Sequence, residues 1–215
     1  MRETKNETKQ LIEALTEDLK PIKCLKHPLK RALCWTLFTG IYVFLIIFYL
    51  GLRPDFIIKI SSEPSYIFEL FLAFAMSMSG AISSHWLCIP DMRGQNWMPV
   101  VSTTLFTVLF GWLFLQFSVE FNFLEQMHFS HCMIDGTLFG LIPAASIVFL
   151  SMRGKTTRPA LMVFMNIIAA CGIGYMGLRL TCGCDNTSHI VIHHILPYIL
   201  MGGIIAVLGQ KLYRW

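Results

Sequence analysis

Residues 33–52 read LCWTLFTGIYVFLIIFYLGL, a run of twenty residues without a charged side chain. At a rise of about 1.5 Å per residue, a helix of this length covers the hydrocarbon core of a bilayer, which is about 30 Å thick. No small-residue cleavage site follows the run, and the residues before it are polar and charged. We therefore expect it to remain as a transmembrane anchor rather than to be removed as a signal peptide.

Five further apolar runs follow along the chain. Hydrophobic residues make up 55% of the sequence and charged residues only 14%, whereas a soluble domain carries about 25% charged residues. The additional candidate spans are residues 66–87, 98–118, 134–150, 160–180 and 190–209. We predict an all-α fold: a six-span transmembrane helix bundle with a short cytoplasmic N-terminal amphipathic helix.

The distribution of Lys and Arg predicts the orientation of this bundle, because cytoplasmic loops carry an excess of these residues. The N-terminal segment, the second and fourth loops and the C-terminal tail together hold fourteen of them. The opposite face holds only Arg53, Lys59 and Arg179. We therefore expect a multi-pass membrane protein with both termini in the cytoplasm.

The segment before the first span carries an apolar stripe at helical spacing, formed by Leu11, Ile12, Leu15 and Leu19. Pro21 ends the predicted helix. A helix this short is marginal on its own and needs a binding partner. The acidic residues of its polar side argue against an anionic lipid surface, which favours Lys and Arg there. We expect a groove of a protein partner to bind the stripe, and the membrane surface is the alternative.

Two clusters of thiols and imidazoles fall on the face opposite to the termini. Residues 180–194 read LTCGCDNTSHIVIHH, and His128, His131, Cys132 and Asp135 form the second cluster. Such ligands can hold a metal, form a disulfide or sense either state; alternatively, they are only the polar ends of membrane helices. Small residues four apart in the last three spans predict close packing that would bring the clusters together: Gly136 and Gly140, Ala170 and Gly174, Gly202 and Ala206.

Several short stretches, taken in order, resemble a known family. They are LIEALTEDLKP at 11–21, GLRPD at 51–55, Cys132, TRPA at 157–160, Cys182 with Asp185, and LGQKLYRW at 208–215. The chain resembles the NrsF family of bacterial membrane anti-sigma factors. The resemblance implies that residues 1–31 form a cytoplasmic segment that binds an extracytoplasmic-function sigma factor, without direct contact to nucleic acid. Residues 32–215 would then form a six-helix transmembrane sensor domain.

In that family one cysteine in each of two outer loops is thought to matter for the response to stress, and the resemblance places these at Cys132 and Cys182. Cys132 enters the fourth span and Cys182 leaves the fifth, so both are expected at one membrane depth. The candidate auxiliary metal ligands are Cys184, His131, His189 and His193. His189 and His193 are four residues apart and would share one helix face. A thiophilic or zinc-like ion could bridge these elements, or an oxidant could join the thiols.

Two other functions compete with a regulator. A thiol oxidoreductase needs a reactive cysteine pair, but Cys182 and Cys184 are separated by one residue, and a bond between them would be strained. A heavy-metal transporter needs ionisable groups along a path, and the spans offer essentially Glu69, for which we expect an interfacial role. Asp135 and Asp185 are expected to be helix caps or partners of imidazole. We predict a sensor without enzymatic activity.

Overall fold

The computed structural model describes residues 2–17, 25–91, 94–120 and 131–213, and every regular element in these ranges is helical. The elements are α1 (Arg2–Glu17), α2 (Pro28–Leu50), α3 (Phe56–Ser62), α4 (Pro64–Leu87), α5 (Met98–Glu120), α6 (Cys132–Met152), α7 (Pro159–Thr181), α8 (Thr187–His189), the π-helix η3 (Ile190–Ile195) and α9 (Leu196–Leu212). Six helices are long and apolar enough to cross a membrane. The predicted all-α, six-span fold with a short N-terminal helix is confirmed, and the chain is a multi-pass membrane protein.

The first span begins five residues earlier than predicted. Pro28 occupies the first turn of α2, where its missing N–H costs nothing and its fixed φ suits a helix. Lys30 and Arg31 follow it inside the helix, because such long side chains reach polar surroundings from a helix end. The Arg31 Nη2 donates to the backbone oxygen of Leu150 over 2.5 Å. The helix ends before Gly51, whose φ of 88° favours glycine.

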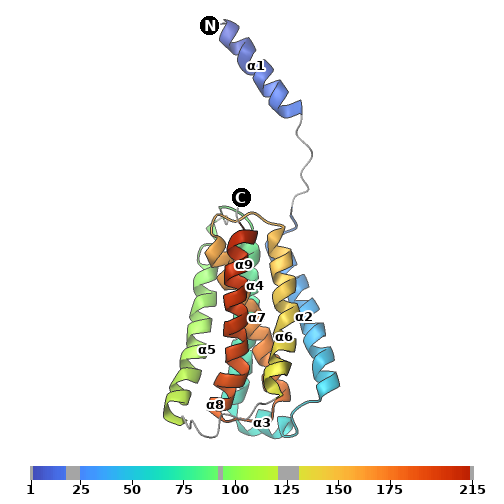
Figure 1. Ribbon diagram of the computed structural model, residues 1–215, viewed down its shortest axis with the longest axis vertical. Helices are drawn as coiled ribbons and strands as arrows, with labels where there is room; N and C mark the ends of the chain where they lie inside the picture. Colours follow the sequence, from blue (N-terminus) through green and yellow to red (C-terminus); the bar gives the residue numbers. More distant parts are fainter. Residues whose placement is uncertain (1, 18–24, 92–93, 121–130, 214–215) are drawn as a thin grey trace.

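Helix α7 lies at the centre of the bundle, and 78% of the residues in its apolar stretch of eighteen residues are buried. It packs against α4, α6 and α9, while α2 and α5 lie at the sides (Figure 1). The approach of α4 to α7 is close enough that a Cβ on Gly80 would lie 2.9 Å from the backbone nitrogen of Ala169. On α6 and α7, Gly140 and Gly174 both lie against the ring of Tyr198. The small residues of the last three spans therefore do allow the close packing that the sequence predicts.

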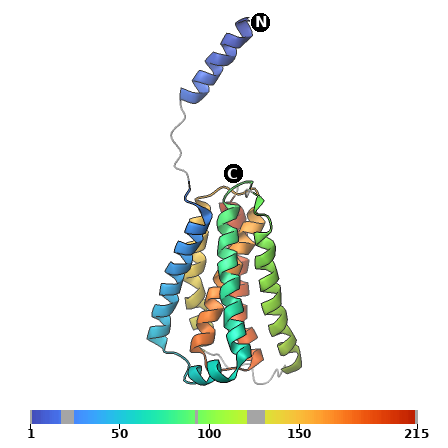
Figure 2. The same ribbon diagram turned by 180° about the vertical axis from the view of Figure 1, so that it is seen from behind.

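The two ends of the bundle differ in what they carry. The start of α2 and the end of α9 lie at one end, and α3 and α8 lie at the other (Figure 1). Beyond the first end, α1 stands apart from the bundle in both views (Figures 1 and 2). Large apolar side chains cover the outside of the spans, for example Phe48, Phe71 and Phe114, as expected of surfaces that face lipid.

Candidate functional site

Two cysteines from different helices meet at the end of the bundle that carries α3 and α8. Cys132 is the first residue of α6, and Cys182 directly follows the last residue of α7. Their sulfur atoms are 3.3 Å apart, which is a contact rather than the bond of about 2.05 Å found in a disulfide. Two thiols that are fifty positions apart in the sequence thus touch at one depth of the bundle.

One irregular turn brings two imidazoles to the same place. His189 ends α8, and its Nε2 lies 3.5 Å from Cys182 Sγ. The next six residues form the π-helix η3, in which hydrogen bonds join residues five apart. His194, five residues after His189, therefore faces it across one turn. The candidate ligand atoms of Cys132, Cys182, His189 and His194, hereafter the Cys–His cluster, all lie within 4.8 Å of one another.

Two other predicted ligands, Cys184 and His193, lie beside the Cys–His cluster. The backbone N–H of Cys184 donates to Cys182 Sγ over 3.5 Å. The His193 ring is buried, with its centroid 4.6 Å from that of His189. His131 is the exposed N-cap residue of α6, and His128 lies outside the described residues. An α-helical spacing of four residues predicts His193 as the partner of His189, whereas the π-helix brings His194 to the cluster. The sequence signals this role of His194 only through the presence of a second imidazole next to His193.

The Cys182 thiol is held in its protonated form. A hydrogen bond with Cys132 and burial both raise the pKa of Cys182 above the ordinary thiol value. Because the thiolate is the reactive form of cysteine, Cys182 is a weak nucleophile at neutral pH as long as Cys132 is its main partner.

A network of charges that includes two buried arginines fixes the segment that carries Cys182. The Asp185 carboxylate is 2.8 Å from Arg53 Nη2, 3.0 Å from Arg179 Nη1 and 3.0 Å from Lys59 Nζ. The two arginines lie over the Tyr66 ring, 5.3 and 5.2 Å from its centroid. Partial burial alone would raise the pKa of Asp185, but the hydrogen bonds from the three cations outweigh it and hold the pKa well below its ordinary value. Asp185 is therefore a carboxylate that joins α7 to α3.

Two interpretations of acidic residues are corrected by this network. Asp185 was expected to cap a helix or to orient an imidazole, but its partners are the three cations. Glu69 was expected to be merely interfacial, but it is buried, accepts from Tyr175 and forms an ion pair with Arg179 at 3.0 Å. Both errors have one cause: most of the partners come from distant parts of the chain, and the residue pattern of a single segment cannot reveal them.

Residues 15–215 match the model of a protein family described as NrsF, negative regulator of sigma F. The chain belongs to the NrsF family. Membership implies negative regulation of a sigma factor, a sigma factor as partner and a regulatory role. Comparison with curated proteins and with solved structures finds no significant match.

The NrsF chain carries its other predicted binding surface on α1. Three stripe residues are exposed, Leu11 by 61%, Ile12 by 55% and Leu15 by 65%. Leu19, the fourth predicted residue of the stripe, lies outside the described residues. An apolar stripe this exposed is a binding surface or an aggregation hazard, which makes α1 the second candidate site of this NrsF protein.

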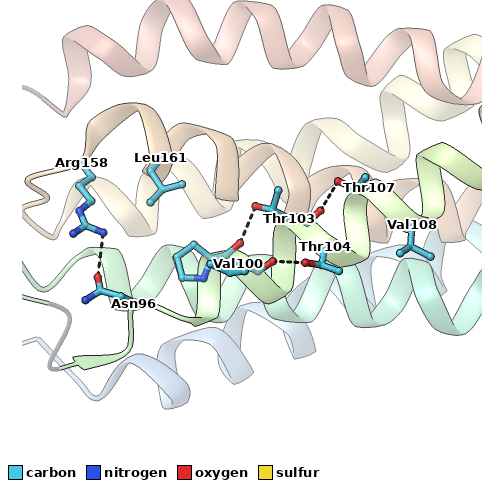
Figure 3. Close-up of a pocket in the computed structure, with 9 residues that line it drawn as sticks. Asn96, Val100, Thr103, Thr104, Thr107, Val108, Arg158 and Leu161 are labelled. Carbon is cyan, nitrogen blue, oxygen red and sulfur yellow. Dashed lines mark hydrogen bonds between the residues drawn. The ribbon is translucent and has the colours of Figure 1, made fainter.

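A groove of about 510 Å³ between α5 and α7 of the NrsF chain carries no comparable chemistry (Figure 3). Its three threonines direct their hydroxyls to their own helix: Thr103 donates to Pro99, Thr104 to Val100 and Thr107 to Thr103, at 2.8 to 2.9 Å. At the mouth, Arg158 donates to Asn96 over 3.1 Å. The polar groups of this groove are thus satisfied within the chain.

Proposed function

We propose that this protein is a membrane-bound anti-sigma factor of the bacterial inner membrane that sequesters an extracytoplasmic-function sigma factor through residues 1–31. A thiol-reactive metal or oxidant, acting from the periplasm at Cys132 and Cys182, releases the sigma factor. One observation carries this proposal: an exposed apolar helix stands beyond one end of the bundle, and a contacting thiol pair lies at the other end. Capture and detection are then on opposite sides of one membrane.

Capture requires an apolar surface that the protein itself does not cover, and α1 provides one. Leu11, Ile12 and Leu15 lie at helical spacing and are each more than half exposed. Full burial of one leucine is worth about 1.5–3 kcal/mol, so three such residues suit the helix-in-groove mode of peptide recognition. The excess of Lys and Arg at this end of the chain supports a cytoplasmic position, where a sigma factor is available.

Coupling between the two ends can run through α6 and α2. Helix α6 begins at Cys132, and α2 leads back toward α1. Three side chains of α2 bond to α6 along its length: Tyr42 to the Leu138 oxygen at 2.7 Å, Trp35 to Ser146 at 2.9 Å and Arg31 to the Leu150 oxygen at 2.5 Å. Pro143 lies inside α6 and removes one backbone hydrogen bond, which gives the helix a point of bending. A shift of Cys132 would therefore move α2, the helix that follows α1 in the chain.

The capture step is tested with the full chain in membranes that contain its sigma factor. Leu15→Asp places a charge on the stripe, and Glu13→Gln is the matched control on the polar side of the same helix. We expect the sigma factor to co-purify with the wild type and with Glu13→Gln, and to be lost by at least tenfold from Leu15→Asp. Equal recovery of the sigma factor with all three proteins would contradict capture by the stripe.

A further inference from the structure

We propose that the Cys–His cluster is a binding site for one resident zinc-class ion, ligated by Cys132, Cys182, His189 and His194. This inference deepens the proposed function and rests on it only for the regulatory consequence, because ion binding itself is argued from geometry. It names the species on which a thiol-reactive signal would act. It adds His194 to the candidate ligands and leaves Cys184, His131 and His193 out of the ligand set.

The distances fit a tetrahedral site. With zinc–sulfur bonds of about 2.3 Å and zinc–nitrogen bonds of about 2.0–2.1 Å, the tetrahedral edges are about 3.8 Å between sulfurs and about 3.6 Å between sulfur and nitrogen. Cys132 Sγ and Cys182 Sγ are 3.3 Å apart, and Cys182 Sγ and His189 Nε2 are 3.5 Å apart. These two pairs require movements of a few tenths of an ångström for ligation. The remaining pairs of ligand atoms lie within 4.8 Å of one another, so rotation of the side chains must bring them closer by at most about 1.5 Å.

His194 gives an independent reason to expect a ligand. It is fully buried, and its ring nitrogens make no hydrogen bond to a nitrogen or oxygen atom within the described residues; the polar group beside the ring is the Cys132 thiol, which is a weak hydrogen-bonding partner. A buried polar group without a partner is costly, and native structures seldom keep one without a function. Its ring reaches the thiols because η3 is a π-helix, a rare form that is frequent at functional sites. A metal bond to one nitrogen would satisfy this imidazole and explain the irregular turn.

The donor set defines the class of ion. Two thiols and two imidazoles prefer zinc and other soft or borderline cations to magnesium or calcium. Four protein ligands close the coordination sphere, which is the arrangement of structural rather than catalytic zinc. On binding, Zn²⁺ displaces one proton from each thiol, and both protons leave to the solvent. The resulting site, one dication with two thiolates and two neutral imidazoles, has no net charge, which suits burial beside the membrane.

A resident ion would join three elements: the start of α6, the end of α7 and the α8–η3 segment that leads into α9. In this state, as in the protein without an ion, the sigma factor stays captured, and release requires that the helix ends be displaced. A softer thiophilic cation would exchange with Zn²⁺ one for one, with no change in the oxidation state of the thiols. Because larger ions lengthen every metal–ligand bond, the exchange itself would displace the first residue of α6.

The site is tested by metal analysis of the full chain, purified in detergent, stripped with a chelator and then titrated with Zn²⁺ or Co²⁺. We expect one ion per chain and, with Co²⁺, the thiolate charge-transfer and d–d bands of a tetrahedral site. His194→Ala should weaken ion binding by at least tenfold, and His193→Ala should leave it unchanged. No stoichiometric binding by the wild type, or binding that depends on His193 and not on His194, would overturn the inference.

A gain-of-function variant keeps the test decisive if His194→Ala does not fold. His194→Cys retains four ligands, so it should bind Co²⁺ with a stronger thiolate band than the wild type. An unchanged Co²⁺ spectrum in this variant would overturn the assignment of His194. The measurement of metal binding is independent of sigma capture. If thiol reagents release the sigma factor from a protein that binds no ion, the inference of a resident ion is wrong and the proposed function stands.

Discussion

Replacing Asp185 by asparagine removes the charge that three cations share while preserving the size of the side chain. The amide keeps one oxygen, which can still accept from Arg53 Nη1 and Arg179 Nη1, whereas its NH2 group cannot accept from Arg53 Nη2, now at 2.8 Å, or from Lys59 Nζ, now at 3.0 Å. A hydrogen bond to a charged group contributes about 1.5–3 kcal/mol. Each arginine retains another acidic partner and the Asp185 side chain is 34% exposed, so solvent screens part of the loss. We therefore expect a destabilisation of about 2–3 kcal/mol in total.

The assay is thermal unfolding of the full chain in detergent, followed by the fluorescence of its five tryptophans. For a chain of this size, 2–3 kcal/mol corresponds to a fall in Tm of roughly 5–10 °C. The matched control is Asp55→Asn, because Asp55 also bonds to Arg53 but to neither of the other two cations. It should lower Tm less than Asp185→Asn does. An equal or larger fall for Asp55→Asn would refute the view that Asp185 joins the three cations.

Three further predictions concern the pH dependence of stability, the packing of α7 and the orientation in the membrane. The Tm difference between the wild type and Asp185→Asn should stay constant from pH 8 to pH 5 and narrow only below about pH 4, because the lowered pKa keeps the folded carboxylate charged where the unfolded one protonates; a difference that vanishes at pH 6 would contradict this. Gly174→Leu should destabilise the protein by about 1–3 kcal/mol or prevent folding, because its side chain would overlap Tyr198, whereas Gly203→Leu, which has open space around it, should be tolerated. In a cysteine-free background, an impermeant maleimide added to intact cells should label Ser61→Cys on α3 but not Lys9→Cys on α1; labelling of Lys9→Cys would reverse the orientation.

Much of the bundle could be predicted from the sequence because each span is a separate apolar run that satisfies its own backbone. The start of α2 was missed because Lys30 and Arg31 are typical of a polar linker. In the structure the Arg31 side chain donates a hydrogen bond to the Leu150 oxygen of α6. The contact of Cys132 with Cys182 could be anticipated from membrane depth, since each lies at a helix end. The depth of a residue in the membrane follows from its place in its own helix, so the sequence can predict it without knowledge of the other helices.

The rest of the site depends on features that no single helix reveals. The choice of His194 over His193 follows from one π-turn, and the sequence at 190–195 carries no pattern that distinguishes a π-turn from an α-turn. The role of Asp185 depends on Arg53, Lys59 and Arg179, which lie 132, 126 and 6 positions away in the sequence. Counting charges did place these three basic residues on one face, but a count alone does not pair them with a carboxylate.

The most direct test of the account is the release of a bound sigma factor by a signal applied only at the opposite face. The full chain would be placed in lipid nanodiscs with its labelled sigma factor, and the dissociation rate measured before and after addition of a thiol-reactive cation. The account predicts dissociation at least tenfold faster in the wild type, and no acceleration in Cys132→Ser or Cys182→Ser, although both variants still bind the sigma factor. Equal acceleration in the wild type and in both variants, or none in the wild type, would contradict control of α1 by the two thiols.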